Sequence, residues 1–321
     1  MLDCKAAIEQ TGILPVINIT EKELALPLAK ALIDGGINAL EVTLRSESSL
    51  ESIAAIKERY PDFILGAGTV LSTEQVDAAL NAGVDFIVCP GNDPEIINYC
   101  LAKHVPVIPG CVTPSEIQEA VKKGVTVLKF FPAELSGGLE AIKLLSGPFP
   151  NVRFIPTGGI NYGNLGSYLS NPKILAAGGS YMATAKQLKE RDFAGITEAC
   201  KKALQISLGF ELAHVGINHE NEQQAVDTAS GIAGLFGLGV RKGNSSVFAG
   251  SYVEAMKMKF YGTKGHIGFY TNSVFRSMAW FEKNGIKVKK ESIRKDEKGA
   301  LQSAYLEDEI GGFAIHVTRR N

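Results

Sequence analysis

Val125-Thr126-Val127-Leu128-Lys129-Phe130-Phe131-Pro132 is a short, nearly continuous apolar run with one charged side chain near its end. A run without polar and apolar alternation is typical of a parallel strand that is covered on both faces. Seven more runs of this kind occur in the first two thirds of the chain. They span residues 13–18, 39–44, 64–69, 86–91, 105–110, 153–159 and 174–180.

Amphipathic helical patterns separate these runs, for example at 21–34, 48–59, 73–82 and 114–123. Residues that favour helix N-termini precede several helical patterns, namely Thr20, Ser72, Asp93 and Thr113. Eight strand–helix units predict an α/β fold of the (β/α)₈ TIM-barrel type. A doubly wound open sheet is the alternative, but Asn18-Ile19-Thr20 offers no G-x-G-x-x-G turn after the first strand.

The pattern changes at about Leu208. Ala213-His214-Val215-Gly216-Ile217-Asn218 and Gly265-His266-Ile267-Gly268-Phe269-Tyr270 are alike, and each opens a strand, a helix and further strands. We expect a helix at 222–236 after the first, and a helix at 274–284 followed by a strand near 286–288 after the second. This weak internal repeat predicts an α+β domain made of paired βαβββ modules. We therefore expect two domains, at residues 1–206 and 210–321.

The composition of the chain bears on the partners and the compartment that we expect. A net charge of −1 gives no indication of nucleic acid or of an acidic membrane surface as a partner. None of the five cysteines forms a C-x-x-C pair, and no apolar segment approaches the length of a membrane span. We expect a cytoplasmic protein with a small-molecule substrate.

In (β/α)₈ proteins the active site lies where the strands end. Lys129 is a lone amine among apolar residues, and desolvation favours the uncharged form that a nucleophile needs. A lysine whose amine reaches solvent at the rim is the alternative. Glu41, inside the second run, suits proton transfer or a structural ion pair with Lys129 or Arg45. Arg45 suits a substrate carboxylate, unless it is an exposed loop residue.

Two glycine pairs follow the seventh and eighth runs, in Thr157-Gly158-Gly159-Ile160 and Ala177-Gly178-Gly179-Ser180. Tight turns alone could explain either pair. Since barrel enzymes often hold a phosphate with the loops after these two strands, an anion site is the better interpretation.

Seven motifs together resemble the 2-keto-3-deoxy-6-phosphogluconate (KDPG) / 2-keto-4-hydroxyglutarate (KHG) aldolase family over residues 1–206. They are Glu41-Val42-Thr43-Leu44-Arg45, Gly66-Ala67-Gly68-Thr69-Val70, Pro90-Gly91, Ile108-Pro109-Gly110, Lys129-Phe130-Phe131-Pro132-Ala133-Glu134, Pro156-Thr157-Gly158-Gly159-Ile160 and Gly178-Gly179-Ser180. The resemblance implies a trimeric class I aldolase, a lyase that needs no cofactor and yields pyruvate.

The same resemblance implies roles for individual residues. Lys129 matches the Schiff-base lysine and Glu41 the proton-transfer carboxylate. The remaining matches are substrate contacts: Arg45 and Thr69 at the keto-acid carboxylate, Pro90 within its motif, Phe131 and Thr157 near the imine, and Gly158, Gly159, Gly179 and Ser180 at the phosphate.

The second product would be glyceraldehyde 3-phosphate from KDPG or glyoxylate from KHG. The segment Thr11-Gly12-Ile13-Leu14 lacks the arginine that many family members carry before the first strand, so KHG remains a candidate substrate.

Residues 210–321 resemble the vicinal oxygen chelate family, which includes glyoxalase I. His214, His266 and His316 fall where that family has metal ligands, with Glu254 as a fourth. Histidine at 316 departs from the usual glutamate and suits a nitrogen-preferring ion, Zn²⁺, Fe²⁺ or Ni²⁺. Strand histidines in a metal-free domain are the alternative.

Two other functions remain open at this point. The second domain could be a metal- or ligand-binding module that regulates the barrel. The barrel could also be a sugar-phosphate isomerase or epimerase that uses the same phosphate site.

Overall fold

The computed structural model describes residues 4–320, and contact density divides the chain into two compact units, Met1–Ser207 and Leu208–Asn321. We describe each unit by itself.

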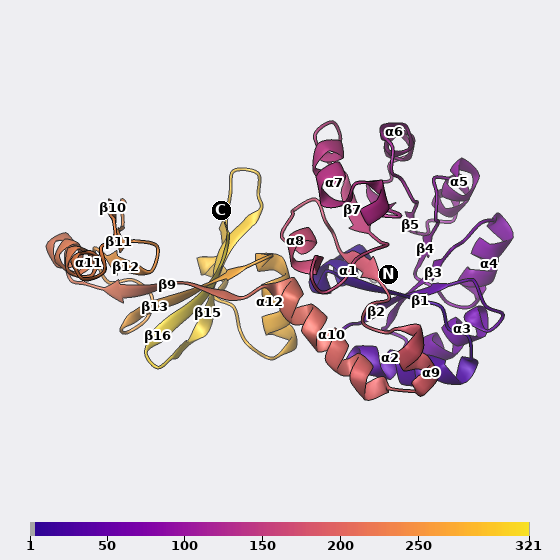
Figure 1. Ribbon diagram of the computed structural model, residues 1–321, viewed down its shortest axis with the longest axis horizontal. Helices are drawn as coiled ribbons and strands as arrows, with labels where there is room; N and C mark the ends of the chain where they lie inside the picture. The colour runs from indigo at the N-terminus through magenta and orange to yellow at the C-terminus, as the bar shows by residue number, and fades with distance from the viewer. Residues whose placement is uncertain (1–3, 321) are drawn as a thin grey trace. The chain divides into compact units, whose positions relative to one another are not determined.

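The N-terminal unit contains eight short parallel strands and the helices that connect them (Figure 1). The strands are β1 (Ile13–Ile17), β2 (Ala39–Thr43), β3 (Ile64–Gly68), β4 (Phe86–Val88), β5 (Val107–Ile108), β6 (Val127–Phe130), β7 (Arg153–Pro156) and β8 (Ala177–Gly179). All eight predicted runs contain a strand, although each strand is shorter than its run.

The strands close into a ring. Six of them pair in the order β5-β4-β3-β2-β1-β8, and β6 pairs with β7. Single bridges complete the circuit, Gly110 to Lys129 between β5 and β6 and Thr157 to Gly178 between β7 and β8. Since all the paired strands are parallel, their carboxyl ends meet at one end of the ring, where the predicted site residues should lie.

The helices of this unit, apart from α1, lie around the ring (Figure 1). The helices are α1 (Cys4–Thr11), α2 (Ala25–Asp34), α3 (Ser49–Arg59), α4 (Thr73–Asn81), α5 (Pro94–Ala102), α6 (Pro114–Lys122), α7 (Gly138–Ser146), α8 (Leu165–Leu169), α9 (Ala185–Glu190) and α10 (Phe193–Leu208). Short 3₁₀ turns, η1 (Lys22–Leu24) and η2 (Glu134–Ser136), precede α2 and α7.

Helix N-caps agree with three of the four predictions. The side chains of Ser72, Asp93 and Thr113 accept hydrogen bonds from the first turns of α4, α5 and α6. Thr20 does not cap a helix, because the chain first forms η1, whose N-cap is Glu21. An extended Glu21 followed by a 3₁₀ turn leaves Thr20 outside the helix.

One end of the ring is filled by α1, which the sequence did not predict. Cys4 and Ile8 of α1 are buried in a cluster with Ala39 and Ile64, the first residues of β2 and β3. Apolar packing therefore covers the amino ends of the strands, which leaves the opposite end as the place for a site.

The C-terminal unit is an eight-stranded sheet with two main helices (Figure 1). Its elements are β9 (Glu211–Asn218), α11 (Glu222–Phe236), β10 (Val240–Lys242), β11 (Ser246–Ala249), β12 (Val253–Met256), β13 (Gly265–Thr271), α12 (Val274–Lys283), η3 (Lys290–Ser292), β14 (Arg294–Lys295), β15 (Leu301–Ile310) and β16 (Phe313–Arg319). The strand order is β10-β11-β12-β9-β13-β16-β15-β14, with β9 and β13 antiparallel at the centre.

Each helix of this unit covers its own apolar cluster. Ala225, Ala229 and Ala233 of α11 pack on Val247 and Ala255. Val274 and Phe281 of α12 pack in a second cluster, with Ala304 and Val317. No helix within residues 4–320 is long and apolar enough to cross a membrane.

Candidate functional site

Lys129 and Glu41 meet inside the ring of the N-terminal unit. Lys129 Nζ donates to Glu41 Oε1 at 2.9 Å, and the two residues are 6% and 1% exposed. The two are 88 residues apart in sequence and come from β6 and β2. A hydrogen bond of this length is a path along which a proton can move between amine and carboxylate.

Two neighbours shape the surroundings of this pair. Gly68 leaves room for the carboxylate, because a Cβ there would lie 2.2 Å from Glu41 Oε1. The ring of Phe131 lies 5.5 Å from Lys129 Nζ, measured to its centroid, and gives the amine an apolar wall. A small side chain at 68 and an aromatic one at 131 therefore both serve the geometry of the pair.

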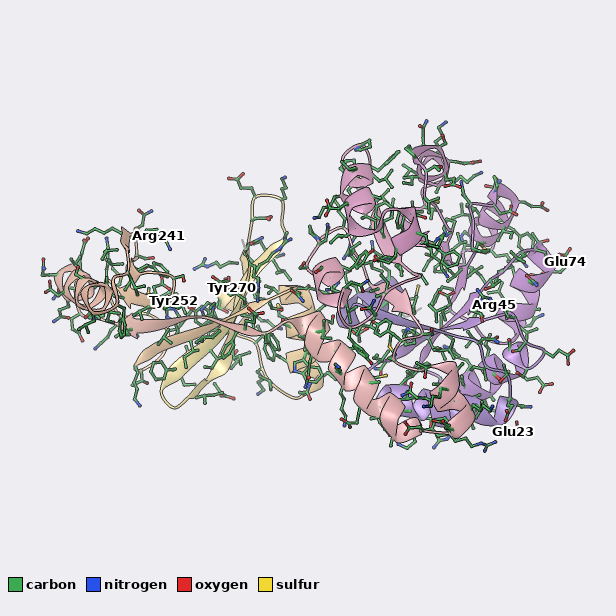
Figure 2. The ribbon with its side chains drawn as sticks, viewed as in Figure 1. Glu23, Arg45, Glu74, Arg241, Tyr252 and Tyr270 are labelled. Carbon is green, nitrogen blue, oxygen red and sulfur yellow. The ribbon has the colours of Figure 1, made fainter. Side chains whose placement is uncertain are left out.

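Arg45 (labelled in Figure 2) follows the end of β2 and is exposed. Its Nε donates to Thr69 Oγ1 at 3.3 Å, which leaves the rest of the guanidinium for a substrate anion. Thr69 has φ +58°, a left-handed conformation that is uncommon for a β-branched residue. Backbone strain of this kind persists where it holds a functional group in place.

The strain at Thr69 gives a testable prediction. Thr69→Val and Thr69→Gly both remove the hydroxyl, so each should raise KM for an anionic substrate held by Arg45 about fivefold, the loss of one hydrogen bond. Only Thr69→Gly also relieves the left-handed strain, so it should be the more stable of the two by about 1 kcal/mol. Thermal unfolding and steady-state kinetics of both variants test this, and equal stability would show that position 69 is unstrained.

A cavity of about 420 Å³ opens beside Arg45 at the strand ends. It is lined by six of the predicted site residues, which are Arg45, Thr157, Gly158, Gly159, Gly179 and Ser180. It is also lined by residues that we did not single out from the sequence, among them Asn18, Thr43, Tyr181 and Thr184. Asn18 follows β1 and Thr43 is two residues beyond Glu41 on the same strand face, so the rule about strand ends could have found both.

Five predicted site residues are not among those that line this cavity, namely Lys129, Glu41, Thr69, Pro90 and Phe131. Pro90 lines a separate depression with Val70 and Leu71. A Cβ on Gly110 would lie only 2.0 Å from the carbonyl oxygen of Pro90, so the two backbones are in close contact. Within the described residues, its clearest role is this close backbone packing against the loop after β5.

The loop after β7 contributes Gly158, Gly159 and Ile160 to the lining of the cavity. The carbonyls of Thr157 and Gly158 accept hydrogen bonds from the N–H groups of Ala133 and Glu134, at 2.8 and 3.1 Å. In a trans peptide the N–H of the next residue points opposite to the carbonyl. The N–H groups of Gly158 and Gly159 therefore point away from residues 133 and 134.

The next carbonyl continues this arrangement. Gly159 O accepts from the side-chain amides of Asn161 and Asn164, both at 3.1 Å. The N–H of Ile160 belongs to the same peptide group and therefore points away from these two amides. Gly158 and Gly159 have φ +98° and +86°, a conformation that glycine adopts without strain. Among residues 4–320 no hydrogen bond from the N–H groups of residues 158, 159 or 160 is found. Three adjacent free N–H groups form a concavity that can hold an anion.

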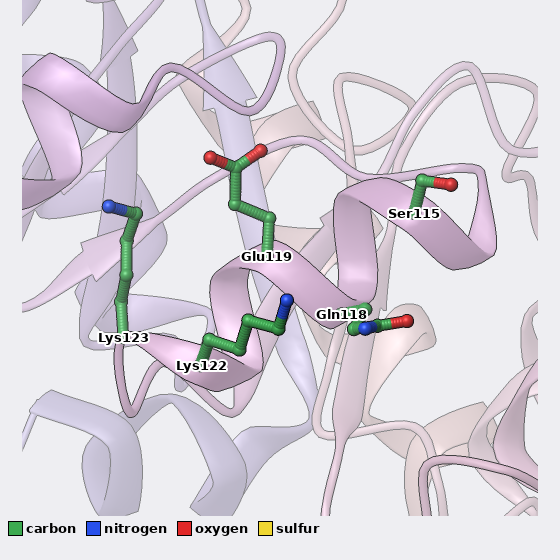
Figure 3. A pocket seen from close by; sticks show the side chains of 5 residues that line it. All are labelled: Ser115, Gln118, Glu119, Lys122 and Lys123. Atoms are coloured by element: carbon green, nitrogen blue, oxygen red, sulfur yellow. The ribbon is translucent and has the colours of Figure 1, made fainter.

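A further depression lies on the outer surface of α6 (Figure 3). It is lined by the polar side chains Ser115, Gln118, Glu119, Lys122 and Lys123. Lys123 Nζ donates to Asn98 Oδ1 at 2.9 Å. The lining contains both a carboxylate, Glu119, and the amines of Lys122 and Lys123. This is a polar helix surface with charges of both signs, and it contains none of the predicted catalytic residues.

The C-terminal unit contains a second cluster of polar side chains. His214 Nε2 lies 3.1 Å from His266 Nε2 and 3.3 Å from His316 Nε2. Glu254 Oε2 lies 3.2 Å from His214 Nε2 and 3.1 Å from His266 Nε2, while Ser246 donates to the other carboxylate oxygen at 2.6 Å. His266 and His316 are buried, whereas His214 and Glu254 are partly exposed.

Burial favours the neutral form of two of these histidines, His214 and His316. It lowers the pKa of His316 to about 3, helped by the neighbouring His214 and His266, and it also lowers the pKa of His214. Burial alone would raise the pKa of the Glu254 carboxyl, but hydrogen bonds from His266 and Ser246 hold it below its usual value. Neutral imidazoles and a carboxylate are the protonation states that bind metal ions.

Two glycines make room for the imidazole rings. Gly216 is paired with both Glu254 and His266, and a Cβ on it would lie 2.0 Å from the His266 ring. Gly268 is paired with both His214 and His316, and its Cβ would lie 2.5 Å from His316 Nε2. The repeated His-x-Gly pattern thus lets each central strand accept rings from its neighbours.

Comparison with known proteins gives a consistent result for the N-terminal unit. The family model described as "KDPG and KHG aldolase" matches residues 4–199, well over half of the chain. The 2-dehydro-3-deoxy-phosphogluconate aldolase of Treponema pallidum is 44% identical over 206 residues, which cover 64% of this chain and 98% of that protein.

Two solved structures are similar as well. The KDPG aldolase of Legionella pneumophila, with pyruvate captured as a covalent carbinolamine intermediate, is 38% identical with a TM-score of 0.61, over 63% of this chain and 98% of that one. The enzyme of Zymomonas mobilis ZM4 with 3-phosphoglycerate is also 38% identical with a TM-score of 0.61, over 64% and 97% of the two chains.

The family model ends at residue 199 and so does not describe the C-terminal unit. Over the N-terminal unit, the family match, the sequence identity to the relatives and the ring of parallel strands all indicate the same family. The chain belongs to the KDPG and KHG aldolase family.

Proposed function

We propose that the chain is a class I aldolase that cleaves a 2-keto-4-hydroxy acid through a Schiff base on Lys129. The observation that carries the proposal is the buried contact of 2.9 Å between the Lys129 amine and the Glu41 carboxylate, at the carboxyl end of the ring. Family membership supports a lyase in preference to a sugar-phosphate isomerase or epimerase.

The reaction follows from these two side chains. Glu41 takes a proton from Lys129, and the neutral amine adds to the C2 ketone. Glu41 returns this proton to the carbinolamine hydroxyl, which leaves as water, and the resulting iminium is an electron sink, so the chemistry requires no cofactor. Glu41, through a water molecule, removes the C4 hydroxyl proton; the C3–C4 bond breaks, and its electron pair forms an enamine. Protonation at C3 and hydrolysis release pyruvate and restore Lys129.

The other substrate contacts follow from the cavity. Arg45, fixed by Thr69, would hold the keto-acid carboxylate, with Phe131 and Thr157 near the imine. The free N–H groups of the loop after β7, together with Gly179 and Ser180, would hold the phosphate of KDPG. We therefore propose KDPG as the preferred substrate and KHG as the weaker one, with glyceraldehyde 3-phosphate and glyoxylate as the second products.

Pyruvate release from KDPG and from KHG, measured with the purified full-length chain, tests this preference. We expect a higher kcat/KM for KDPG, because only KDPG carries a phosphate for the N–H groups after β7. An equal or higher kcat/KM for KHG would contradict the assigned phosphate site. The absence of pyruvate from both substrates would contradict the aldolase assignment itself.

We further propose that the C-terminal unit is a vicinal oxygen chelate (glyoxalase-like) domain with a divalent metal site. Its two halves, β9 to β12 and β13 to β16, each run strand, helix and three strands. Donor residues stand on the first and last strand of each half: His214 and Glu254, then His266 and His316. The alternative role, a module that regulates the barrel, uses the same site.

The donor atoms fit a single ion. Two ligands at about 2.0–2.1 Å from a tetrahedral zinc lie about 3.3–3.4 Å apart. Four of the donor pairs, the three that include His214 and the pair of His266 with Glu254, are 3.1 to 3.3 Å apart, and the three histidine donors all lie within 4.8 Å of one another. The Nδ1 atoms of His266 and His316 are buried without a hydrogen-bond partner among residues 4–320. The polar neighbours of both rings lie at Nε2, which faces the other donors. A set of three imidazoles and one carboxylate favours Zn²⁺, Fe²⁺ or Ni²⁺. When bound, such an ion would act as a Lewis acid.

The metal site predicts a clear analytical result. Elemental analysis of the full-length chain, purified without chelator, should find about one of these ions per chain. The double variant His214→Ala/His266→Ala should lose it, whereas His219→Ala should keep it, because His219 contacts Thr228 at 2.8 Å outside the cluster. Added metal at 100 times Kd should stabilise the unit against unfolding by about 2.7 kcal/mol. Metal content that the double variant leaves unchanged would eliminate the site.

Two expectations from the sequence remain predictions. A homotrimer would be seen by light scattering of the purified chain as about three chain masses. A cytoplasmic location would be seen by fractionation of cells that express the protein.

A further inference from the structure

Glu134 lies directly behind the anion-binding loop but does not line the cavity. Its backbone N–H donates to Gly158 O at 3.1 Å, and its side chain packs across Gly159. A Cβ on Gly159 would lie 2.4 Å from Glu134 Cγ and 2.7 Å from its Cβ. The absence of a side chain at 159 therefore accommodates Glu134 as well as the turn.

The carboxylate of Glu134 is fixed from the other side by Tyr168. The Tyr168 hydroxyl donates to Glu134 Oε1, and Tyr168 is 2% exposed. Burial and the adjacent carboxylate raise the pKa of this hydroxyl, so it remains a donor at neutral pH. A Cβ on Gly138 would lie 3.1 Å from both oxygens, so a second glycine makes room for the pair.

This contact connects the segment that holds the start of the loop to the helix that follows the end of the loop. Glu134 is in η2, after β6, while Tyr168 is in α8, the helix that follows residues 158–164. Asn161 and Asn164, at the other end of the loop, hold Gly159 O. The free N–H groups of residues 158 to 160 thus lie between two anchored segments. Binding costs less when such donors are already oriented, because no loop ordering accompanies it.

We propose that Glu134 and Tyr168 are positioning residues that hold the loop after β7 in its anion-binding form and so set the preference for a phosphorylated substrate. This inference rests on the proposed aldolase function and its phosphate site. The two residues touch neither the amine nor the keto-acid end of the substrate, so their effect is confined to the phosphate end.

The test compares KDPG and KHG cleavage by full-length variants. Glu134→Ala and Tyr168→Phe should each raise KM for KDPG about tenfold, with kcat for KDPG and kcat/KM for KHG unchanged. Glu134→Gln should remain close to the wild type, because its amide oxygen can still accept from Tyr168. Trapping of pyruvate by borohydride on Lys129 should be the same in all of them.

Tyr99→Phe is the matched control. Tyr99 also donates to a carboxylate, Asp77, at 2.6 Å, but it joins α5 to α4 and does not contact the loop after β7. It should leave the preference between the two substrates unchanged. If the buried Tyr168→Phe variant does not fold, Glu134→Ala, at an exposed residue, decides alone.

Three results would overturn the inference: equal changes for both substrates, no change for either, or a wild type that cleaves only KHG. A wild type that cleaves neither substrate would be a failure of the proposed function itself. That failure is recognised by the wild type alone, which would then be inactive with both substrates.

Discussion

Replacement of Lys129 by methionine is expected to reduce aldol cleavage by roughly four orders of magnitude or more, the effect of losing a covalent nucleophile. Methionine keeps the length and apolar packing of the stem but cannot form an imine. The measurement is pyruvate release at saturating substrate, together with trapping of pyruvate by borohydride, which should also be lost.

Folding must be separated from chemistry in this experiment. Lys129→Met leaves the carboxylate of Glu41 buried without its partner. The loss of one member of a buried ion pair typically lowers the free energy of unfolding by about 3–5 kcal/mol. The double variant Lys129→Met/Glu41→Gln removes both charges and should fold more stably while staying inactive. Lys57→Met is a control, since Lys57 is a partly buried lysine paired with Asp85 at 2.9 Å outside the site. Cleavage by Lys129→Met within about tenfold of the wild-type rate would contradict a covalent role for this amine.

Glu41→Gln should lower kcat by about 10²- to 10⁴-fold, the usual contribution of a general acid or base. Glutamine has nearly the same shape and can still accept from Lys129, but it cannot take the C4 hydroxyl proton. Pyruvate should therefore still be trapped on Lys129, at a lower rate. This combination of a slow reaction and a retained imine separates proton transfer from the structural ion pair that the sequence left open.

A carboxylate elsewhere in the same unit provides the comparison. Glu116 accepts from the backbone of Val112 and Thr113 in the capping box of α6. Glu116→Gln should affect the stability of the helix and leave kcat unchanged. If Glu41→Gln behaved in the same way, with stability altered and turnover intact, Glu41 would be a structural partner of Lys129 only.

Much of the candidate site could be predicted, because in a barrel the order of the strands along the chain determines which strand ends lie side by side. Strand ends meet at one end of the ring, so Lys129 and Glu41 could be paired although they are 88 residues apart. The positions of Pro90 and Phe131 relative to the cavity could not be predicted in this way. They depend on loop conformation, for example on the close approach of Gly110 to Pro90, which no periodicity encodes.

The contacts that support the site were also hidden from the sequence. Glu134 and Tyr168 are each unremarkable in their segments, and only the fold places one beside the other. The helix α1 was missed because its pattern is short and lacks a clear apolar stripe, although Ile8 completes the core.

In the C-terminal unit the longer elements were predicted well and the short edge strands were not. The helix at Glu222–Phe236 has the predicted bounds, since a long amphipathic pattern with an Asn221 cap is a strong signal. The strand expected at 286–288 is wrong: only an isolated bridge from Val288 to Leu306 occurs there, and β14 lies further on, at Arg294–Lys295. Edge strands as short as β10 and β14 are determined by pairing with a neighbour, which local sequence does not specify.

The central claim is that the Lys129 amine forms an imine with a 2-keto acid. Its most direct test is incubation of the full-length chain with pyruvate and borohydride, followed by mass analysis of the peptides. We predict one reduced pyruvyl group per chain, on the peptide that contains Lys129. An unmodified chain, or a modified lysine elsewhere with Lys129 intact, would contradict the account.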